Sequence, residues 1–483
     1  MSDFRHIIRG STYLAVGAQV GRMVNFIQVL LLTNYLGPTE FGIWSLIQAL
    51  PAMLIVMTDL GLNSVMLRAI ARNKAQEQEV IQGVLSLKCF LAPVYVLAVY
   101  LIARNSGHDR HVVHLATLSS LAMVAGLCGE TIIAAWRAHE RFGLETKITL
   151  AKDVTSSLLL IGVTLFGFGL KGLVWANVGH SLLVSVLLLR WYLKQKPVLW
   201  VISPIGDYFR QIRAAVPFAV YGLLNPLSTQ LALVMLGSMS GLTAVGIYNI
   251  ALRIIVFLYF IPNALNRTLL PRLSAQFAAV RQEAYRDTIG KALQLVLVIA
   301  LPVAVGLSLT AHDFVALLFP SEFAAAGHVL VLLALSVPCF YIRVVVRAAV
   351  YAAGREKAAL VVTATTTALN LVLNWFLIPR FGYDGAAMTT LIAEALQTGA
   401  FCCLMGRDIS FKGARGFLMK IVLASSVMGA AVWSTQGVPL VVRVSLGAAV
   451  YLAALFILRV VTSTMIRSYW IGEDDVTRMP SAR

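Results

Sequence analysis

Charged residues are scarce in this sequence. Only 13% of the 483 residues are Asp, Glu, Lys or Arg, whereas 59% are hydrophobic. A soluble domain carries about 25% charged and about 45–50% apolar residues. Connections between the apolar runs reach about twenty residues, too few for an extramembrane domain of about fifty residues or more. The composition therefore excludes a soluble protein and predicts an all-α, polytopic membrane protein that acts within the bilayer.

Sequence motifs of common enzymes are also absent. The chain has no Gly-x-x-x-x-Gly-Lys-Ser/Thr phosphate loop, no Gly-x-Ser-x-Gly nucleophile turn and no paired carboxylates in a connection. The sequence therefore shows no motif for ATP hydrolysis or for acyl or glycosyl transfer, and we predict that the chain is not an enzyme. A membrane glycosyl polymerase or ligase would need a sizeable outward loop, which this sequence lacks.

Candidate metal and disulfide residues are few. His108, Asp109, His111 and His114 form the densest group of possible ligands, but the histidines are three residues apart, with no cysteine and no glutamate helix motif beside them. All five cysteines fall inside apolar segments, where thiols behave as small hydrophobic groups. We therefore predict no metal site and no disulfide framework.

Apolar runs long enough to cross a bilayer recur along the whole chain. Windows near twenty residues give about fourteen spans. They cover residues 11–36, 42–62, 80–103, 112–135, 147–169, 172–193, 213–237, 243–266, 289–311, 327–350, 357–379, 383–405, 416–434 and 439–461. The first run is too long for a signal-peptide core and lacks a small-residue cleavage pattern, so it is predicted to be a retained first helix.

The net charge of +17 is distributed unevenly between the two sets of connections. Arg and Lys gather near 68–74, 137–147, 190–213, 272–291, 355–357 and 407–420 and in the tail, whereas the opposite set has only Arg104, Arg110, Lys171, Arg380 and Arg443. Positive residues concentrate on the cytoplasmic side of membrane proteins. This asymmetry predicts cytoplasmic termini and explains most of the charge without a nucleic-acid partner.

A repeat relates the two halves of the chain. Gly37-Pro38-Thr39-Glu40-Phe41-Gly42-Ile43-Trp44 returns 204 positions later as Gly241-Leu242-Thr243-Ala244-Val245-Gly246-Ile247-Tyr248, and Phe168-Gly169 has an echo at Phe381-Gly382. We predict two six-helix lobes, 1–195 and 205–406, followed by an extra helix pair and tail, 413–483. Because six is even, the lobes should be related by an axis along the membrane normal and enclose a central cavity.

Polar groups inside the predicted spans are the candidate substrate site. An ionisable side chain at the bilayer centre costs about 2.5–3.5 kcal/mol, so it needs a partner, water or a function. The predicted cavity residues are Arg22, Asn25, Gln28, Gln48, Asn225, Gln230, Arg253, Asn263 and Arg343. A guanidinium can hold phosphate or carboxylate oxygens bidentately. The alternative is that each arginine belongs to a structural ion pair with Asp59, Glu130, Asp153 or Glu394.

Three intramembrane acids are candidates for ion coupling: Asp59, Asp153 and Glu394. A buried carboxylate can take up a proton or bind Na⁺. Single acids near helix ends more often support helix packing or pair with arginine, so both interpretations stay open. No cofactor is predicted apart from a coupling H⁺ or Na⁺.

The ordered motifs of residues 5–406 resemble the oligosaccharide flippases of the multidrug/oligosaccharidyl-lipid/polysaccharide (MOP) superfamily, in the polysaccharide transporter or Wzx-type branch. The motifs are Tyr35 to Gly42, Asp59-Leu60-Gly61-Leu62, Val245 to Tyr248, Pro271-Arg272-Leu273-Ser274, Leu317 to Phe323 and Asn370 to Gly385. Each motif is short, and their order and spacing carry the resemblance.

The resemblance implies an alternating-access transporter that moves an undecaprenyl-pyrophosphate-linked oligosaccharide across a bacterial inner membrane for polysaccharide biosynthesis. It further implies a cationic cavity at Arg22 and Arg253. The protein is expected to be a monomer that is in contact with membrane lipids and delivers the oligosaccharide to the polysaccharide polymerase machinery. The alternative within the same superfamily is an ion-coupled exporter of small molecules or drugs, although a cavity for cationic drugs should have an excess of acids.

Overall fold

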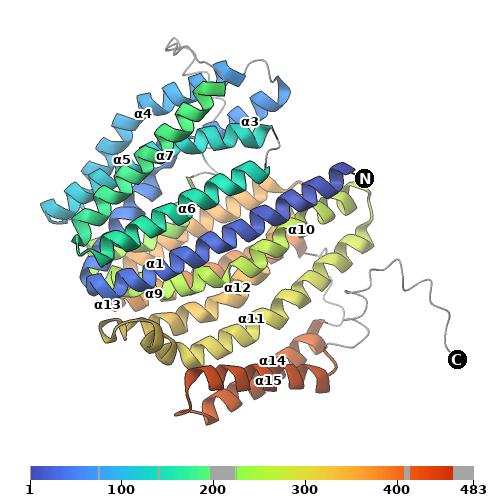
Figure 1. The fold of residues 1–483 in the computed structure, drawn as a ribbon. Coiled ribbons are helices and arrows are strands. Elements are labelled where there is room, and N and C mark those ends of the chain that lie inside the picture. Colours follow the sequence, from blue (N-terminus) through green and yellow to red (C-terminus); the bar gives the residue numbers. More distant parts are fainter. Residues whose placement is uncertain are drawn as a thin grey trace. The chain divides into compact units, whose positions relative to one another are not determined.

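The computed structural model describes residues 2–73, 77–139, 142–195, 223–224, 226–406 and 414–460. The side chains of residues 2–20, 22, 142, 195 and 414–415 are outside the described part. Across the described ranges every regular element is a helix (Figure 1). The predicted all-α membrane fold class is therefore confirmed.

The helices follow the predicted apolar runs. The first are α1 (Ser2–Leu54), α2 (Val56–Asp59), α3 (Leu62–Arg72), α4 (Glu77–Asn105), α5 (Arg110–Ala138), α6 (Phe142–Leu165) and α7 (Gly169–Gln195). After a short apolar helix, Pro226–Met239, come α9 (Leu242–Leu258), α10 (Phe260–Ala278), α11 (Gln282–Leu318), η2 (Ser321–Phe323), α12 (Ala326–Ala352), α13 (Glu356–Met405), α14 (Ala414–Ser434) and α15 (Leu440–Ile457).

Two of the long helices are bent at glycines of the repeated motifs. Gly37 (φ 66°) divides α1, and Gly382 (φ 57°) divides α13. A positive φ is accessible to glycine at little steric cost, which explains why glycine stands at both bends. Within the described residues, eleven helices are long and apolar enough to cross a membrane. The figure of fourteen spans stays a prediction.

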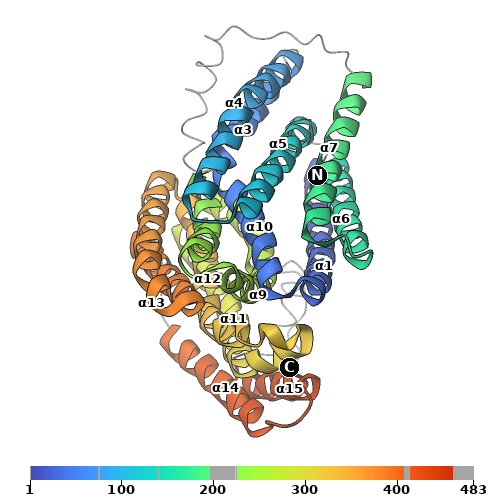
Figure 2. The same ribbon diagram turned by 90° about the vertical axis from the view of Figure 1, so that its left-hand side faces the viewer.

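The chain forms two compact units. The first comprises residues 1–260, 318–329 and 363–389, and the second comprises 261–317, 330–362 and 390–483. Within the first unit α1 packs against α5, α6 and α9, and α5 packs against α7 (Figure 2). The predicted lobes 1–195 and 205–406 and the predicted tail segment 413–483 stay predictions.

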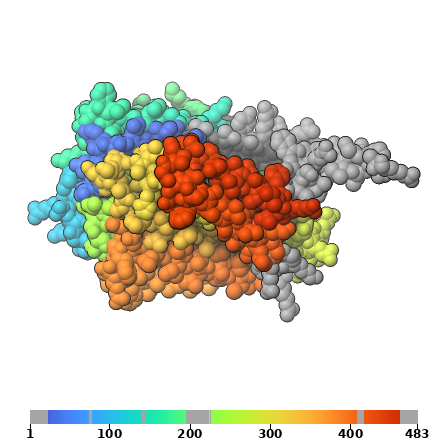
Figure 3. All heavy atoms as spheres, turned by 90° about the horizontal axis from the view of Figure 1, so that it is seen from below, coloured from blue at the N-terminus to red at the C-terminus, as the bar shows by residue number. Residues whose placement is uncertain are grey.

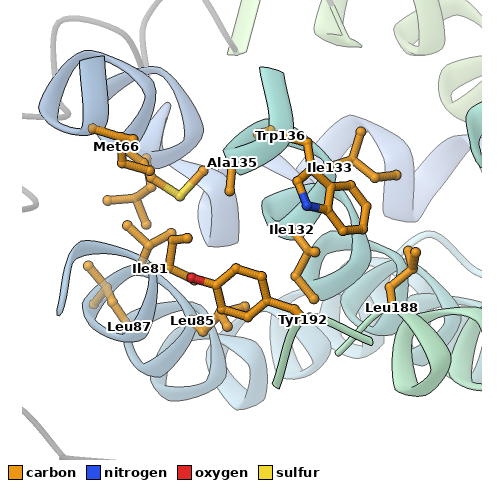
Figure 4. Close-up of a cluster of buried hydrophobic side chains, with 14 residues drawn as sticks. Met66, Ile81, Leu85, Leu87, Ile132, Ile133, Ala135, Trp136, Leu188 and Tyr192 are labelled. Carbon is orange, nitrogen blue, oxygen red and sulfur yellow. The ribbon is translucent and has the colours of Figure 1, made fainter. Parts of the chain in front are cut away.

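One hydrophobic core of the first unit lies where α3, α4, α5 and α7 meet (Figure 4). Leu62, Met66 and Ile70 recur every four residues on α3 and are fully buried in this core. Arg68 and Arg72 lie on the exposed side of the same helix. The spacing places one apolar face of α3 against the bundle, with its basic face outside.

In the second unit the hairpin α14–α15 packs on α11 through a separate hydrophobic cluster. The Tyr451 hydroxyl donates to the Val298 carbonyl oxygen at 2.7 Å, and the buried Arg443 forms an ion pair with Asp313. The hairpin's other side carries exposed apolar side chains such as Val441 and Phe456, and Figure 3 shows the hairpin, in red, at the surface. Such a surface suits a helix pair in contact with lipid.

Candidate functional site

A cavity of about 720 Å³ lies within the first unit. Its wall is formed by α1, α5, α6 and α7, and Arg253 is added from α9. Asn25, Gln28, Gln48 and Asp153 also line it, so the fold brings together five of the predicted site residues. Cavities of about 300–1,000 Å³ are typical of sites for drug-sized ligands. The space is therefore large enough for part of a headgroup that contains several sugar rings.

Arg253 is the basic group on the α9 side of the cavity. Its Nη1 donates to Asn25 Oδ1 at 3.3 Å, and Asn25 Nδ2 in turn donates to Gln28 Oε1 at 3.5 Å. Within the described residues Arg253 makes this one hydrogen bond and no ion pair with a carboxylate. A guanidinium has five N–H donors. Most of its donors are therefore available to an anionic or hydroxyl-rich ligand in the cavity.

The second arm of α1, beyond Gly37, contributes Trp44 and Gln48 to the wall. Gln48 Oε1 accepts a hydrogen bond from the Ser119 hydroxyl on α5 at 2.8 Å, which fixes the orientation of the amide. Within the described residues the amide nitrogen donates no hydrogen bond, so it is available to a ligand in the cavity that Gln48 lines. An amide next to an indole ring offers both hydrogen bonding and a flat apolar face, which is a common way to hold a sugar ring.

Ionisable residues on α5, α6 and α7 form another part of the wall. Lys152 forms an ion pair with Glu130, and Asp153 lines the cavity beside them. His180 Nε2 lies 2.9 Å from the Thr155 hydroxyl. The described residues contain no group of three or more His, Cys, Asp or Glu side chains that could hold a metal ion.

This charged wall changes the expected electrostatics of the site. Among described side chains the cavity has two cations, Lys152 and Arg253, and two carboxylates, Glu130 and Asp153. The predicted excess of positive charge thus depends on Arg22. That residue lies on α1 next to Gly21, which lines the cavity, but its side chain is outside the described residues.

Sequence reasoning did not select Lys152 or His180 for the site. Lys152 was visible as a neighbour of Asp153, and His180 was visible as an ionisable group in the middle of an apolar run. An intramembrane ionisable residue is by default a candidate for function. That signal was sufficient to include both residues.

Arg343 and Glu394 lie together in the second unit and are not among the residues that line the cavity. Arg343 Nε donates to Glu394 Oε2 and Nη2 donates to Oε1, both at 2.9 Å. The guanidinium carbon also lies 4.8 Å from the centre of the Phe340 ring. The geometry is that of a bidentate, buried ion pair, the alternative that the sequence left open for this arginine.

Asp59 is also engaged by a lysine. Lys88 Nζ lies 2.7 Å from Asp59 Oδ1 and donates to Asn63 Oδ1 and Thr131 Oγ1, both at 2.9 Å. The Lys88 side chain is only 2% exposed, so its charge depends on these partners. The cluster joins α2, α3, α4 and α5 beside the interruption between helices α2 and α3 at Leu60 and Gly61.

The remaining predicted site residues are Gln230, Asn263 and Asn225. Gln230 is half-buried on the short helix Pro226–Met239, and Asn263 is half-buried on α10 in the second unit. Neither is among the residues that line the cavity. Asn225 lies outside the described residues.

Family comparisons agree with this helical membrane architecture. The chain belongs to the polysaccharide biosynthesis protein family, whose model matches residues 7–277. A second family model, described as lipid II flippase MurJ, matches residues 172–454. The predicted resemblance to polysaccharide flippases is therefore confirmed, and the chain is a multi-pass membrane protein.

Two curated relatives align over most of the chain. A probable low-salt glycan biosynthesis flippase of Haloferax volcanii is 21% identical over 418 residues, which cover 84% of this chain and 85% of the relative. A putative O-antigen transporter of Shigella flexneri is 22% identical over 415 residues, covering 81% of this chain and 96% of the relative.

Solved structures share the fold. The lipid II flippase MurJ in an inward closed conformation has a TM-score of 0.75 at 15% identity and covers 96% of this chain and 99% of its own. An inward-facing multidrug resistance transporter of the MATE family has a TM-score of 0.62 at 17% identity. The match covers 80% of this chain and 94% of the transporter. At these identities the likeness concerns the fold.

Proposed function

We propose that this protein is a flippase that moves a lipid-linked oligosaccharide across the membrane for polysaccharide biosynthesis. The observation that carries the proposal is the cavity in which Arg253 donates a single hydrogen bond among the described residues and lies with Asn25 and Gln48 in the wall. A guanidinium suits the phosphate of a lipid-linked sugar, and amides and hydroxyls suit the sugar itself. The family and the two relatives, one a probable flippase and one a putative O-antigen transporter, support the same conclusion.

The finer features of the proposal follow the sequence. The carrier lipid is undecaprenyl pyrophosphate, the membrane is the bacterial inner membrane, and both termini are cytoplasmic, as the positive charge of alternate connections indicates. Transport is by alternating access in a monomer, with the product delivered to the polymerase machinery. Coupling to H⁺ or Na⁺ uses Asp153, the predicted acid that lines the cavity.

The test is a deletion strain complemented with the wild-type protein, Arg253→Ala or Arg253→Lys. Deletion should abolish the surface polysaccharide and leave its lipid-linked repeat unit on the inner leaflet. Loss of a hydrogen bond to a charged ligand costs about 1.5–3 kcal/mol, so Arg253→Ala should lower flipping by about 10- to 150-fold. Arg253→Lys keeps the charge and should retain more activity. Normal polysaccharide without accumulation in the deletion strain would exclude the proposed function.

A second candidate is export of small cationic molecules. The carboxylates Glu130 and Asp153 in the cavity wall favour it, and the fold resembles that of a multidrug resistance transporter. Overexpression should then raise resistance to cationic drugs, and Asp153→Asn should remove the resistance. Unchanged resistance on overexpression excludes this candidate.

A further inference from the structure

Three oxygen atoms surround the ammonium nitrogen of Lys88 inside the first unit. Asp59 Oδ1 lies 2.7 Å from Nζ, and Asn63 Oδ1 and Thr131 Oγ1 each accept a hydrogen bond from it at 2.9 Å. The Thr131 hydroxyl donates its own hydrogen to the Leu127 carbonyl oxygen at 2.9 Å, so its lone pairs are left for the lysine. An ammonium group has three N–H donors and no acceptor. The three oxygens, here called the oxygen cage, therefore equal its donors in number.

The backbone between α2 and α3 brings two members of the oxygen cage together. Asp59 is the last residue of α2, and Asn63 belongs to the first turn of α3. The two helices are separated by Leu60 and Gly61, which both have a left-handed backbone with φ of 44° and 75°. Because of this interruption, side chains from two separate helices reach one nitrogen atom.

The distances in the oxygen cage indicate which kind of cation it accepts. Charge-assisted N–H···O bonds are about 2.7–2.9 Å long, which is the range observed around Nζ. Mg²⁺ binds oxygen at about 2.0–2.1 Å and Ca²⁺ at about 2.3–2.6 Å, and both take about six or more ligands. The cage offers one carboxylate and two neutral oxygens. It therefore suits a primary ammonium ion rather than a divalent metal ion.

Burial differs sharply between the two charged partners. The Lys88 side chain is 2% exposed, whereas the Asp59 side chain is 27% exposed. Truncation of Lys88 at Cβ would remove three carbon atoms and the ammonium nitrogen. The resulting space would have the size of n-propylammonium and would lie next to a carboxylate that is accessible from outside the core.

The oxygen cage occurs in one copy of the repeat and is not required by the repeated architecture. The residues 204 positions after Asp59 and Lys88 are Asn263 and Ala292. The second copy thus builds the equivalent helices α10 and α11 without a charge at either position. A charge within the membrane is costly and needs a partner or a function. Its presence in the first copy therefore indicates a role that is specific to this unit.

We propose that Asp59, Asn63 and Thr131 form a binding site for a primary ammonium ion, and that Lys88 is its built-in occupant. The ammonium group is tethered to α4, so its occupancy of the cage does not depend on the ions in solution. It fixes the interruption between α2 and α3 to α4 and α5. Asp59, a candidate for ion coupling in the sequence, is held by this internal cation. A dissolved primary ammonium ion takes the same place when Lys88 is shortened.

The test is chemical rescue of Lys88→Ala in the purified full-length protein. The added ion is n-propylammonium, which has the atoms that the substitution removes. Denaturant titration in detergent micelles measures the folding equilibrium constant with and without the ion. The substitution should lower this constant, and the ion should raise it again. A ligand at ten times its dissociation constant raises it by about elevenfold, so a gain of about tenfold that is absent in the wild type is expected.

Three additives at the same concentration separate the effects of volume, charge and hydrogen bonding. 1-Propanol fills the space without a charge, tetramethylammonium is a cation without an N–H donor, and NaCl matches the ionic strength. Each should leave the folding equilibrium constant of Lys88→Ala near its value without additive. Equal rescue by any of the three, or no rescue by n-propylammonium, overturns the proposal.

A second pair of variants locates the bound ion. Asp59→Asn combined with Lys88→Ala removes the carboxylate of the cage and should abolish the rescue. The matched control combines Lys88→Ala with Glu283→Gln, which removes an exposed carboxylate on α11 and should keep the rescue. Rescue that persists in the Asp59→Asn variant overturns the assigned site. The measurement needs no transport assay, so its outcome is independent of the proposed function.

The proposal also makes an expectation for a Lys88→Ala protein that does not fold without the ion. Cells grown with n-propylammonium should then yield the folded protein, and cells grown with 1-propanol should not. The wild type grown under both conditions is the control, and its yield should be the same in each. Absence of folded Lys88→Ala from both cultures overturns the proposal.

Discussion

The ion pair between Arg343 and Glu394 gives the sharpest prediction about stability. The two side chains are only 10% and 17% exposed and share two hydrogen bonds of 2.9 Å. Removing one partner of a buried pair costs about 3–5 kcal/mol, because the other charge is left without compensation. Replacing both partners by apolar residues of similar size is often neutral or stabilising. We therefore expect Glu394→Gln to lower the free energy of unfolding by about 3 kcal/mol or more.

The matched variant is Arg343→Met with Glu394→Leu, which removes both charges together. It should unfold within about 1 kcal/mol of the wild type and should still restore surface polysaccharide. Unfolding is measured by denaturant titration of the purified protein in detergent micelles, followed by the loss of helical circular dichroism. A stable but inactive double variant, or a Glu394→Gln protein with wild-type stability and no transport, would refute the structural role. Arg343 and Glu394 would then act in transport, as the sequence first suggested.

Two further predictions concern Lys88 and Asp153. Lys88→Met removes the cationic partner of the Asp59 carboxylate and one of the two donors to Asn63 Oδ1, and it should cost about 1–3 kcal/mol. Adding Asp59→Leu should recover part of that loss, and no recovery in the same titration would show that the charge is not the cause. If Asp153 carries the coupling ion, Asp153→Asn should lower gradient-driven transport by about 5-fold or more. The transport that remains in this variant should not respond to a protonophore or to removal of Na⁺. Wild-type sensitivity in Asp153→Asn would remove it from the coupling site.

The contact between α1 and α9 shows how a repeat in the sequence becomes a contact in the structure. The motif copies place equivalent glycines at 37 and 241, and both have a positive φ. In the structure the two helices that carry these motifs, α1 and α9, pack against each other within the first unit. It could not predict that Gly42 and Gly246 meet backbone to backbone, because that depends on how closely the two helices pack.

The sequence by itself determined the membrane class, the positions of most helices and the repeat. Each of these depends on local hydropathy, on turn residues or on a motif that is read without knowledge of the fold. The apolar runs and the glycines at 37 and 382 therefore marked helices and bends correctly. The same local signals also led to the correct family.

Only the tertiary structure decided which polar residues share a site. Successive residues of a helix differ by about 100° in direction, so an uncertainty of one residue in a helix boundary moves a side chain from the cavity to lipid or to a neighbouring helix. Asn25, Gln48, Asp153 and Arg253 converge on one cavity, whereas Arg343 is paired elsewhere with Glu394. The partner of an intramembrane charge comes from another helix, and helix packing alone brings the two together.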